Sequence, residues 1–321
     1  MNDSTIALNS PSALWAGLSR VPGVAWILGF LVIGFAFATG DFLSGPNLLN
    51  IGLQSVILLM LALPMTLIIM TEGVDISMGA LLTLASVVLA WVLAHDGSLM
   101  LALAASLAIG LVFGLANGML VAWLKMPPFV VTLGTMGMAE GLALLFTDGQ
   151  SIVVANDTLA AVYGGSLLGI PQTLLIGAIA YVFTHWLLYH TRFGTYIFAL
   201  GGNPDALSLA GIRTNAYLIA VYAFGGLMTG LAALILTSRM SSGHPTAAIG
   251  MEFDAIAAVV VGGTSFEHGN GWLFGTLLGV LAVGALRNGL NLLTVPSSVQ
   301  VSCIGLLVIV ALLIDGFKGK K

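Results

Sequence analysis

Charged side chains are scarce in this 321-residue sequence, in which Asp, Glu, Lys and Arg make up 7% of the residues and hydrophobic types 59%. Soluble domains carry about 25% charged residues. The mean hydropathy is +1.08, which excludes a water-soluble domain and predicts an integral membrane protein. The alternation of polar and apolar positions that marks a membrane β-barrel is also missing, so the spanning elements should be helices.

Cysteine is almost absent, and the one cysteine, Cys303, lies in an apolar run. A disulfide framework and a thiolate metal cluster are therefore excluded. The sequence lacks GxxxxGK[ST], HExxH and GxSxG motifs, and its five histidines form no metal-ligand pattern, so we expect no catalytic residue, no metal and no cofactor. The net charge of −4 is spread thinly and argues against nucleic acid as a partner.

Long apolar runs predict an all-α polytopic bundle of about ten transmembrane helices, with residues 1–321 forming a single transmembrane domain. A run at 254–262 is too short to cross a bilayer alone, so it either extends backward through Met251 or belongs to a broken helix. The other predicted spans are 24–38, 48–70, 76–94, 99–124, 128–146, 171–189, 216–237, 272–293 and 299–313.

Basic residues fall mainly on one side of these spans. With the N-terminus in the cytoplasm, seven of the nine Lys and Arg residues would be cytoplasmic. The positive-inside rule therefore predicts that both termini are cytoplasmic. Glycines recur every four residues at Gly110, Gly114 and Gly118, and again at 271, 275 and 279, with a similar pair at 226 and 230. We expect these small-residue stripes to be surfaces where helices pack closely.

One long polar interruption, at 191–215, carries a helix signal of its own. Asn203 suits a helix N-cap, Pro204 the first helical position and Asp205 the positive end of the helix dipole, while Gly211 can end the helix. These residues predict a short helix from Asn203 to Ala210, about 12 Å long. Flanking arginines place it in the cytoplasm, where we interpret it as a contact element for another protein. A plain connecting loop is the alternative.

Acidic residues stand at the ends of apolar runs, where we expect them to stay hydrated. They form two pairs, Glu72 with Asp75 and Glu252 with Asp254. Asp75 is expected to cap the helix that follows it by accepting from the amides of Ser77 and Met78. A proton or cation relay is the alternative interpretation.

Polar residues inside the predicted spans are candidates for contact with a polar substrate. They are Gln54, Asn117, Arg287, Asn288 and Asn291. Arg287 and Asn291 stand one turn apart and share a helix face. Snorkelling of the arginine and hydrogen bonds between helices explain the same residues equally well.

Four segments in this order resemble the membrane permeases of ribose-type ABC importers for monosaccharides: MT at 65–66 with GVDIS at 73–77, RFGTYIFALGGNPDALSLAGI at 192–212, EFDAIAAVVVGGTS at 252–265 and NGLNLL at 288–293. The resemblance implies a permease in the bacterial inner membrane that works with cytoplasmic ATPase subunits, a periplasmic sugar-binding protein and a second permease, identical or homologous. It also implies a helix coupled to the ATPase, for which the matching residues are Gly201, Gly202, Asn203, Pro204, Asp205, Ala206, Ala210 and Gly211.

An ion-coupled secondary sugar carrier is the alternative function. Such a carrier would need its acidic residues within the membrane and would have no use for a capped cytoplasmic helix. The chain lacks a phosphate loop, so as a permease it should leave ATP hydrolysis to a separate subunit.

Overall fold

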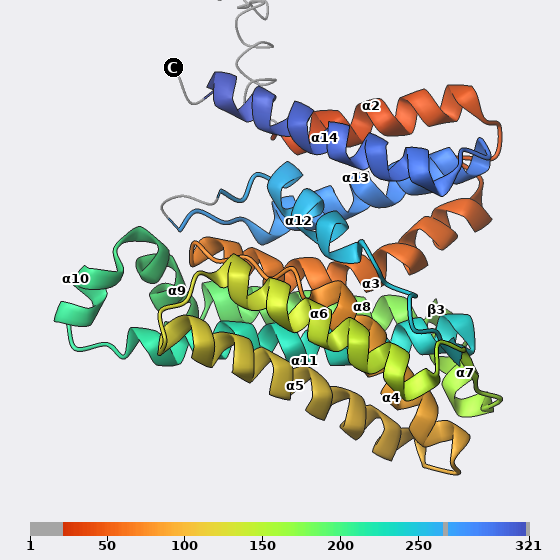
Figure 1. The fold of residues 1–321 in the computed structure, drawn as a ribbon. Coiled ribbons are helices and arrows are strands. Elements are labelled where there is room, and N and C mark those ends of the chain that lie inside the picture. Colours follow the sequence, from red (N-terminus) through yellow and green to blue (C-terminus); the bar gives the residue numbers. More distant parts are fainter. Residues whose placement is uncertain (1–21, 266–268, 319–321) are drawn as a thin grey trace, which may run out of the picture.

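The computed structural model describes residues 22–265 and 269–318, without the side chains of 311, 312 and 314–318. This part of the chain is a helical bundle (Figure 1). Its helices are α2 Gly23–Ala38, α3 Gly45–Met70, α4 Met78–Ala94, α5 Leu99–Ala122, α6 Pro128–Thr147, α7 Asp157–Gly164, α8 Gln172–Tyr189, α9 Arg192–Gly202, α10 Pro204–Leu209, α11 Thr214–Met240, α12 Met251–Val261, α13 Leu273–Leu292 and α14 Ser297–Lys318. Its strands are β1 Ile152–Val153, β2 Ser166–Leu167, β3 Ile170–Pro171 and β4 Ser242–Gly243.

Among the described residues, six helices are long and apolar enough to cross a membrane, namely α3, α5, α6, α8, α11 and α13. Three more apolar helices are shorter, Gly23–Ala38, Met78–Ala94 and Ser297–Val310. The predicted class of an all-α membrane protein is confirmed. The predicted spans coincide with these helices and with α12, apart from shifts of a few residues at their ends.

Helix α3 is the centre of the bundle, because it contacts α8 and α11 on one side and α12 and α13 on the other. Every residue from 55 to 70 is buried. Helices α2, α12, α13 and α14 form one group that lies over a second group made of α4, α5, α6, α8 and α11 (Figure 1). Helices α9 and α10 project at one end of the bundle, and α7 with β3 lies at the opposite end.

Glycines let α5 and α11 approach with their backbones in contact, as the stripes predicted. A Cβ atom on Gly118 would lie 2.8 Å from the Cα of Ile219, and one on Gly230 would lie 2.8 Å from the carbonyl oxygen of Ser106. The Ser106 hydroxyl donates to the carbonyl of Gly230 at 2.7 Å, which fixes the relative height of the two helices. The small residues are therefore packing surfaces.

Helix α12 begins at Met251, so the short apolar run does extend backward to that residue, yet the helix is still too short to cross a bilayer alone. It has 11 residues, about 16 Å at 1.5 Å per residue, roughly half the thickness of a bilayer core. The chain reaches it through β4, which pairs antiparallel with β1 so that Gly243 faces Ile152. Gly250, with φ +88°, turns the chain into the helix. Such irregular backbone is tolerated in a membrane where protein surrounds it.

Candidate functional site

The polar interruption folds into two helices, α9 and α10, that meet at Asn203. The Asn203 side chain accepts a hydrogen bond from the amide of Ala206 at 2.9 Å, as expected of an N-cap. Pro204 occupies the first turn with Asp205, and the helix ends at Leu209. The chain then turns through Gly211, which has φ +80° and open space around it. The predicted helix therefore exists, shortened to six residues.

The polar residues before Asn203 predict a connecting segment, but the structure has helix α9 there. Its buried residues include Gly194, Ile197, Leu200 and Gly201, which recur at intervals of three or four. That spacing is the helical period, and it was the available signal. A Cβ atom on Gly201 would clash with the carbonyl oxygen of Met70 at the end of α3 and lie 2.5 Å from the Cα of Gly269. Helix α9 thus rests directly on the backbone of the bundle.

Helix α10 presents an apolar side chain to the outside. Leu207 is buried against the bundle, whereas Leu209 is 90% exposed. Ala206, Ala210 and Gly202 are also exposed and small. Leu209 is thus a large apolar side chain on the exposed side of α10, with small residues beside it.

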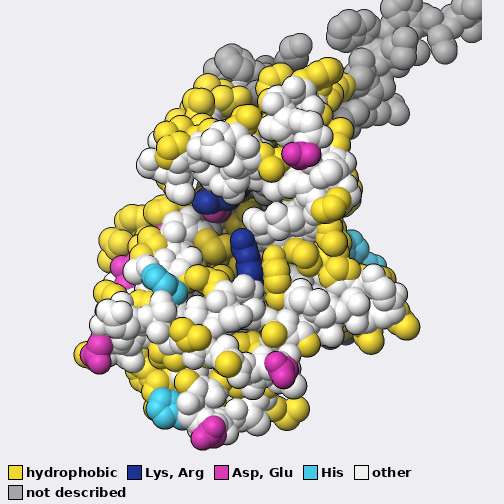
Figure 2. Space-filling view, turned by 90° about the vertical axis from the view of Figure 1, so that its right-hand side faces the viewer, with side chains coloured by type: hydrophobic (Ala, Val, Ile, Leu, Met, Phe, Trp, Pro, Cys, Tyr) yellow, Lys and Arg dark blue, Asp and Glu magenta, His cyan; other side chains and the backbone are white. Residues whose placement is uncertain are grey.

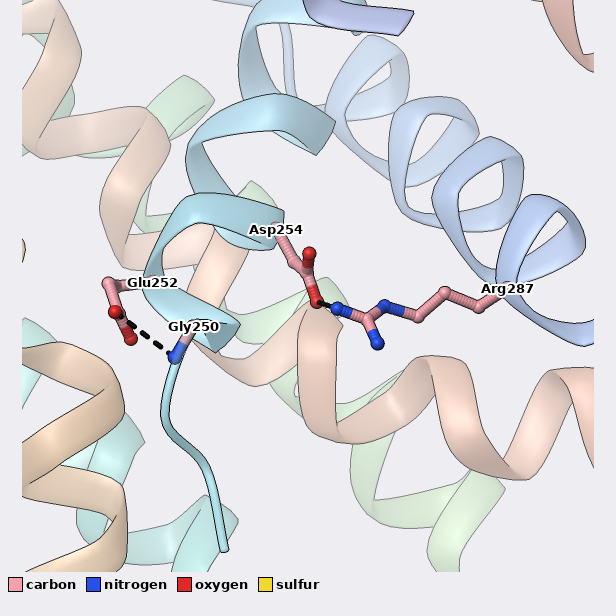
Figure 3. Close-up of polar contacts among 4 residues, drawn as sticks. All are labelled: Gly250, Glu252, Asp254 and Arg287. Atoms are coloured by element: carbon pink, nitrogen blue, oxygen red, sulfur yellow. Dashed lines mark hydrogen bonds and ion pairs between the residues drawn. The ribbon is translucent and has the colours of Figure 1, made fainter. Parts of the chain in front are cut away.

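A second polar feature joins α12 to α13 (Figure 3). The guanidinium of Arg287 forms an ion pair of 2.5 Å with the carboxylate of Asp254. The Asp254 side chain is 7% exposed and that of Arg287 36%. The buried Nε of Arg287 has no hydrogen-bond partner. Glu252 projects from another side of α12 and accepts from the amide of Gly250 at 3.1 Å (Figure 3).

The two helices that carry this ion pair are held together by glycines. A Cβ atom on Gly262, the residue that caps the end of α12, would lie 2.6 Å from the carbonyl of Gly275 on α13. A Cβ atom on Gly279 would clash with the carbonyl oxygen of Ala258. Because backbone touches backbone, α12 and α13 have no room to slide. The ion pair is therefore a fixed feature of the surface.

Viewed from the end opposite α10, the surface is hollowed between the two helix groups (Figure 2). Basic side chains lie in this hollow, with an acidic side chain beside one of them. A cation on a membrane-spanning helix is costly when it faces acyl chains. A hollow that holds such cations is suited to water or to the surface of another protein.

The expectation that the acids at the ends of apolar runs stay hydrated holds for Glu72, which is exposed. It is wrong for Asp75, Glu252 and Asp254, which are all buried. Asp75 does cap α4 in part, since its carboxylate accepts from the Ser77 amide at 2.9 Å and from the Ser77 hydroxyl at 2.6 Å. The end of an apolar run is not the edge of the membrane when a helix begins inside the bundle. Neighbouring helices then cover the acid.

Most of the candidate amides make hydrogen bonds within the protein. Asn288 and Asn47 donate to each other at 2.9 Å, which joins α13 to α3. Asn291 accepts from Gln300 of α14 at 2.8 Å. The other contacts are those of Gln54 with Asn50 and of the fully buried Asn117 with Ser77 and Asp75. The bonds of Asn117, Asn288 and Asn291 favour the alternative of helix packing, whereas the bond of Gln54 stays within α3. Buried polar atoms without a hydrogen-bond partner remain on Arg287, at Nε, and on Asn117, at Oδ1.

Comparison with known proteins identifies the family. The family model described as branched-chain amino acid transport system / permease component matches residues 47–312. The chain is 40% identical over 285 residues to the ribose import permease protein of Haemophilus influenzae, covering 88% of each chain. It is 41% identical over 290 residues to the ribose import permease protein of Bacillus subtilis, covering 90% of each.

A more distant relative is the D-allose transport system permease protein of Escherichia coli K12, 32% identical over 295 residues, which are 91% of this chain and 90% of the relative. No solved structure matches the chain. The relatives are transport components and not enzymes. The chain therefore belongs to the branched-chain amino acid transport system / permease component family, and within it to the membrane permeases of ribose-type ABC sugar importers.

Proposed function

We propose that this chain is the transmembrane subunit of an ATP-driven importer in the bacterial inner membrane, and that it translocates a ribose-like monosaccharide delivered by a periplasmic binding protein. The relatives at about 40% identity are named as ribose permeases, and the relative named for allose is 32% identical. Ribose is therefore better supported than allose as the transported sugar. Two permeases, identical or homologous, form the path, and two cytoplasmic ATPase subunits drive it.

The observation that carries the coupling proposal is Leu209. This leucine is 90% exposed on a six-residue helix that stands away from the bundle. Leaving a leucine in water forgoes about 1.5–3 kcal/mol of burial, and contact with the ATPase recovers it. The proposed contact set comprises Gly202, Asn203, Pro204, Asp205, Ala206, Ala210 and Gly211, with Leu209 added. The candidate Gly201 drops out of it, because Gly201 is buried against the end of α3.

Transport also needs a polar path, which we place along the face that carries Arg287 and Asp254. The Arg287 side chain is 36% exposed, and placing a charged side chain against lipid costs free energy. A second permease therefore covers this face and encloses water. The guanidinium and carboxylate supply hydrogen-bond donors and acceptors to sugar hydroxyls without trapping a neutral molecule by charge. Gln54, Asn117, Asn288 and Asn291 contribute to the path only if their internal hydrogen bonds break.

The coupling proposal is tested by Ala206→Arg and Leu209→Asp, each of which places a charge on the exposed side of α10. Both variants should insert and fold normally, yet lose association with the ATPase and sugar-stimulated ATP hydrolysis. Ala160→Arg is the matched control, because Ala160 is exposed on the short helix α7 at the other end of the bundle. Normal transport by Ala206→Arg at normal expression would remove α10 from the coupling role.

The ion-coupled carrier remains the alternative, since Asp75, Glu252 and Asp254 lie inside the protein as a carrier would require. Uptake into vesicles separates the two functions. An importer should follow ATP and ignore a protonophore, whereas a carrier should survive ATP depletion and fail with the protonophore. The purified chain alone should neither bind nor hydrolyse ATP, because it has no phosphate loop.

A further inference from the structure

A small hairpin before α8 carries apolar side chains that nothing covers. Strands β2 and β3 pair antiparallel with Leu167 opposite Ile170, so Leu168 and Gly169 form a two-residue turn. Their φ angles are +55° and +80°. Positive φ at both central residues is the mark of a type I′ turn.

Leucine is a poor choice for the first position of this turn. Asn, Asp and Gly adopt positive φ at the least cost, and Leu is disfavoured there. Packing does not compensate, because Leu168 is 95% exposed. Leu167 and Ile170, which are cross-strand partners and share a face, are 58% and 47% exposed. Packing within the fold therefore accounts for only part of the apolar surface of Leu167 and Ile170 and for almost none of that of Leu168.

The position of the hairpin limits what it can touch. Helix α8 begins at Gln172, directly after β3, and is one of the candidate membrane spans. At about 3.3 Å per residue, the turn stands no more than roughly 10 Å from the start of that span. The polar interfacial layer of a bilayer is about 5–8 Å thick on each side of the core. The turn is therefore within reach of that layer.

The composition around the hairpin also suits lipid better than a protein partner. The sequence contains no Asp, Glu, Lys or Arg between Asp157 and Arg192. A docking surface for a soluble protein typically has a polar rim that includes charges. An uncharged tip can enter the interfacial layer without burying a charge.

We propose that Leu167, Leu168 and Ile170 insert into the interfacial layer of the bilayer at the end of the bundle opposite α10, where they hold α8 at a fixed depth. The occupant of this apolar surface is thus lipid. The inference depends on the membrane location of α8 and not on which sugar is carried.

The test places an environment-sensitive NBD fluorophore on Leu168→Cys in a Cys303→Ser background, with the full chain reconstituted in lipid nanodiscs. Emission should be blue-shifted and quenched by lipids brominated in their acyl chains, but not by iodide. The control is Gln150→Cys, an exposed position in the loop after α6, where iodide should quench and brominated lipid should not. Iodide quenching at 168 equal to that at 150 would overturn the proposal. Protection from both quenchers would indicate a protein contact and would overturn it too.

A second variant separates anchoring from folding. Leu168→Asn creates the Asn-Gly pair that type I′ turns favour, so its thermal unfolding midpoint in detergent should equal or exceed that of the parent. With NBD on Leu167→Cys, the same substitution should nevertheless abolish quenching by brominated lipid, because the tip no longer holds the hairpin in the interface. Unchanged quenching would show that Leu168 is no anchor.

Discussion

Replacing Gly230 by alanine should test how far the α5–α11 contact limits this fold. The added Cβ would lie 2.8 Å from the carbonyl oxygen of Ser106 and 2.9 Å from the Cα of Leu107. Ordinary van der Waals contact begins at 3.4 Å, and both obstructing atoms belong to backbone, so no side-chain rotation can relieve the overlap. The helices must separate, which also stretches the bond from Ser106 to the Gly230 carbonyl.

Overpacking of this kind costs about 1–3 kcal/mol. We expect Gly230→Ala to lower the thermal unfolding midpoint of the purified protein in detergent by several degrees. Gly226→Ala should be worse, because its Cβ would overlap the carbonyl oxygen of Gly110 even more closely. The matched control is Gly137→Ala in α6, where nothing lies within 4 Å of the added atom. The control should be neutral or stabilising by up to about 1 kcal/mol.

The order of the three variants is the decisive result, measured as the midpoint of fluorescence-detected unfolding. Gly137→Ala should be the most stable, then Gly230→Ala, then Gly226→Ala. If all three variants have the same unfolding midpoint as the parent protein, the α5–α11 contact can accept an added methyl group without cost. The glycine stripes would then not be close-packing surfaces.

Three further changes test other parts of the chain. Asn203→Ala removes the cap of α10 and should destabilise that helix by about 1 kcal/mol. The variant should insert normally but bind the ATPase more weakly in a pull-down. Binding at the wild-type level would show that the cap is not needed for the ATPase contact. Arg287→Met leaves the buried Asp254 without its partner and should lower the unfolding midpoint by more than Arg287→Lys does, because a buried carboxylate is costly without a cation beside it. Equal midpoints for the two variants would show that the charge at position 287 does not stabilise the fold. Cysteines at Ala160 and Ser208 should label from opposite sides of the membrane, the first from the periplasm, and the reverse pattern would invert the proposed orientation.

Local chemistry made α10 predictable from the sequence. Asn203 and Pro204 specify the start of a helix through contacts with adjacent residues alone. The cap at Asn203 is therefore formed as expected. Helix α9 was less visible, because its two terminal glycines and its charged first residue resemble a connecting segment. Its helical signals are the N-cap at Thr191, which accepts from the Gly194 amide, and the buried residues three and four apart that contact the bundle.

The burial of the acids could not be deduced in the same way. Hydropathy places Asp254 at the edge of an apolar run, yet α12 begins after a series of turns that follows β4, and the Asp254 side chain is buried there. Its partner, Arg287, is 33 positions away on α13, a pairing that depends on how the two helices cross. Long-range contacts of this kind depend on tertiary packing, which no local pattern in one sequence encodes.

The contact of Gly201 with the end of α3 has a mechanical consequence. Side chains absorb small displacements by changing rotamer, but the backbone of α9 meets the Met70 carbonyl and the Cα of Gly269 with no side chain between them. Side-chain rearrangement can therefore absorb almost none of a displacement of α10 before the displacement reaches the central helix and the segment that follows α12. A movement of a fraction of an ångström at the surface would thus arrive in the middle of the bundle nearly undiminished.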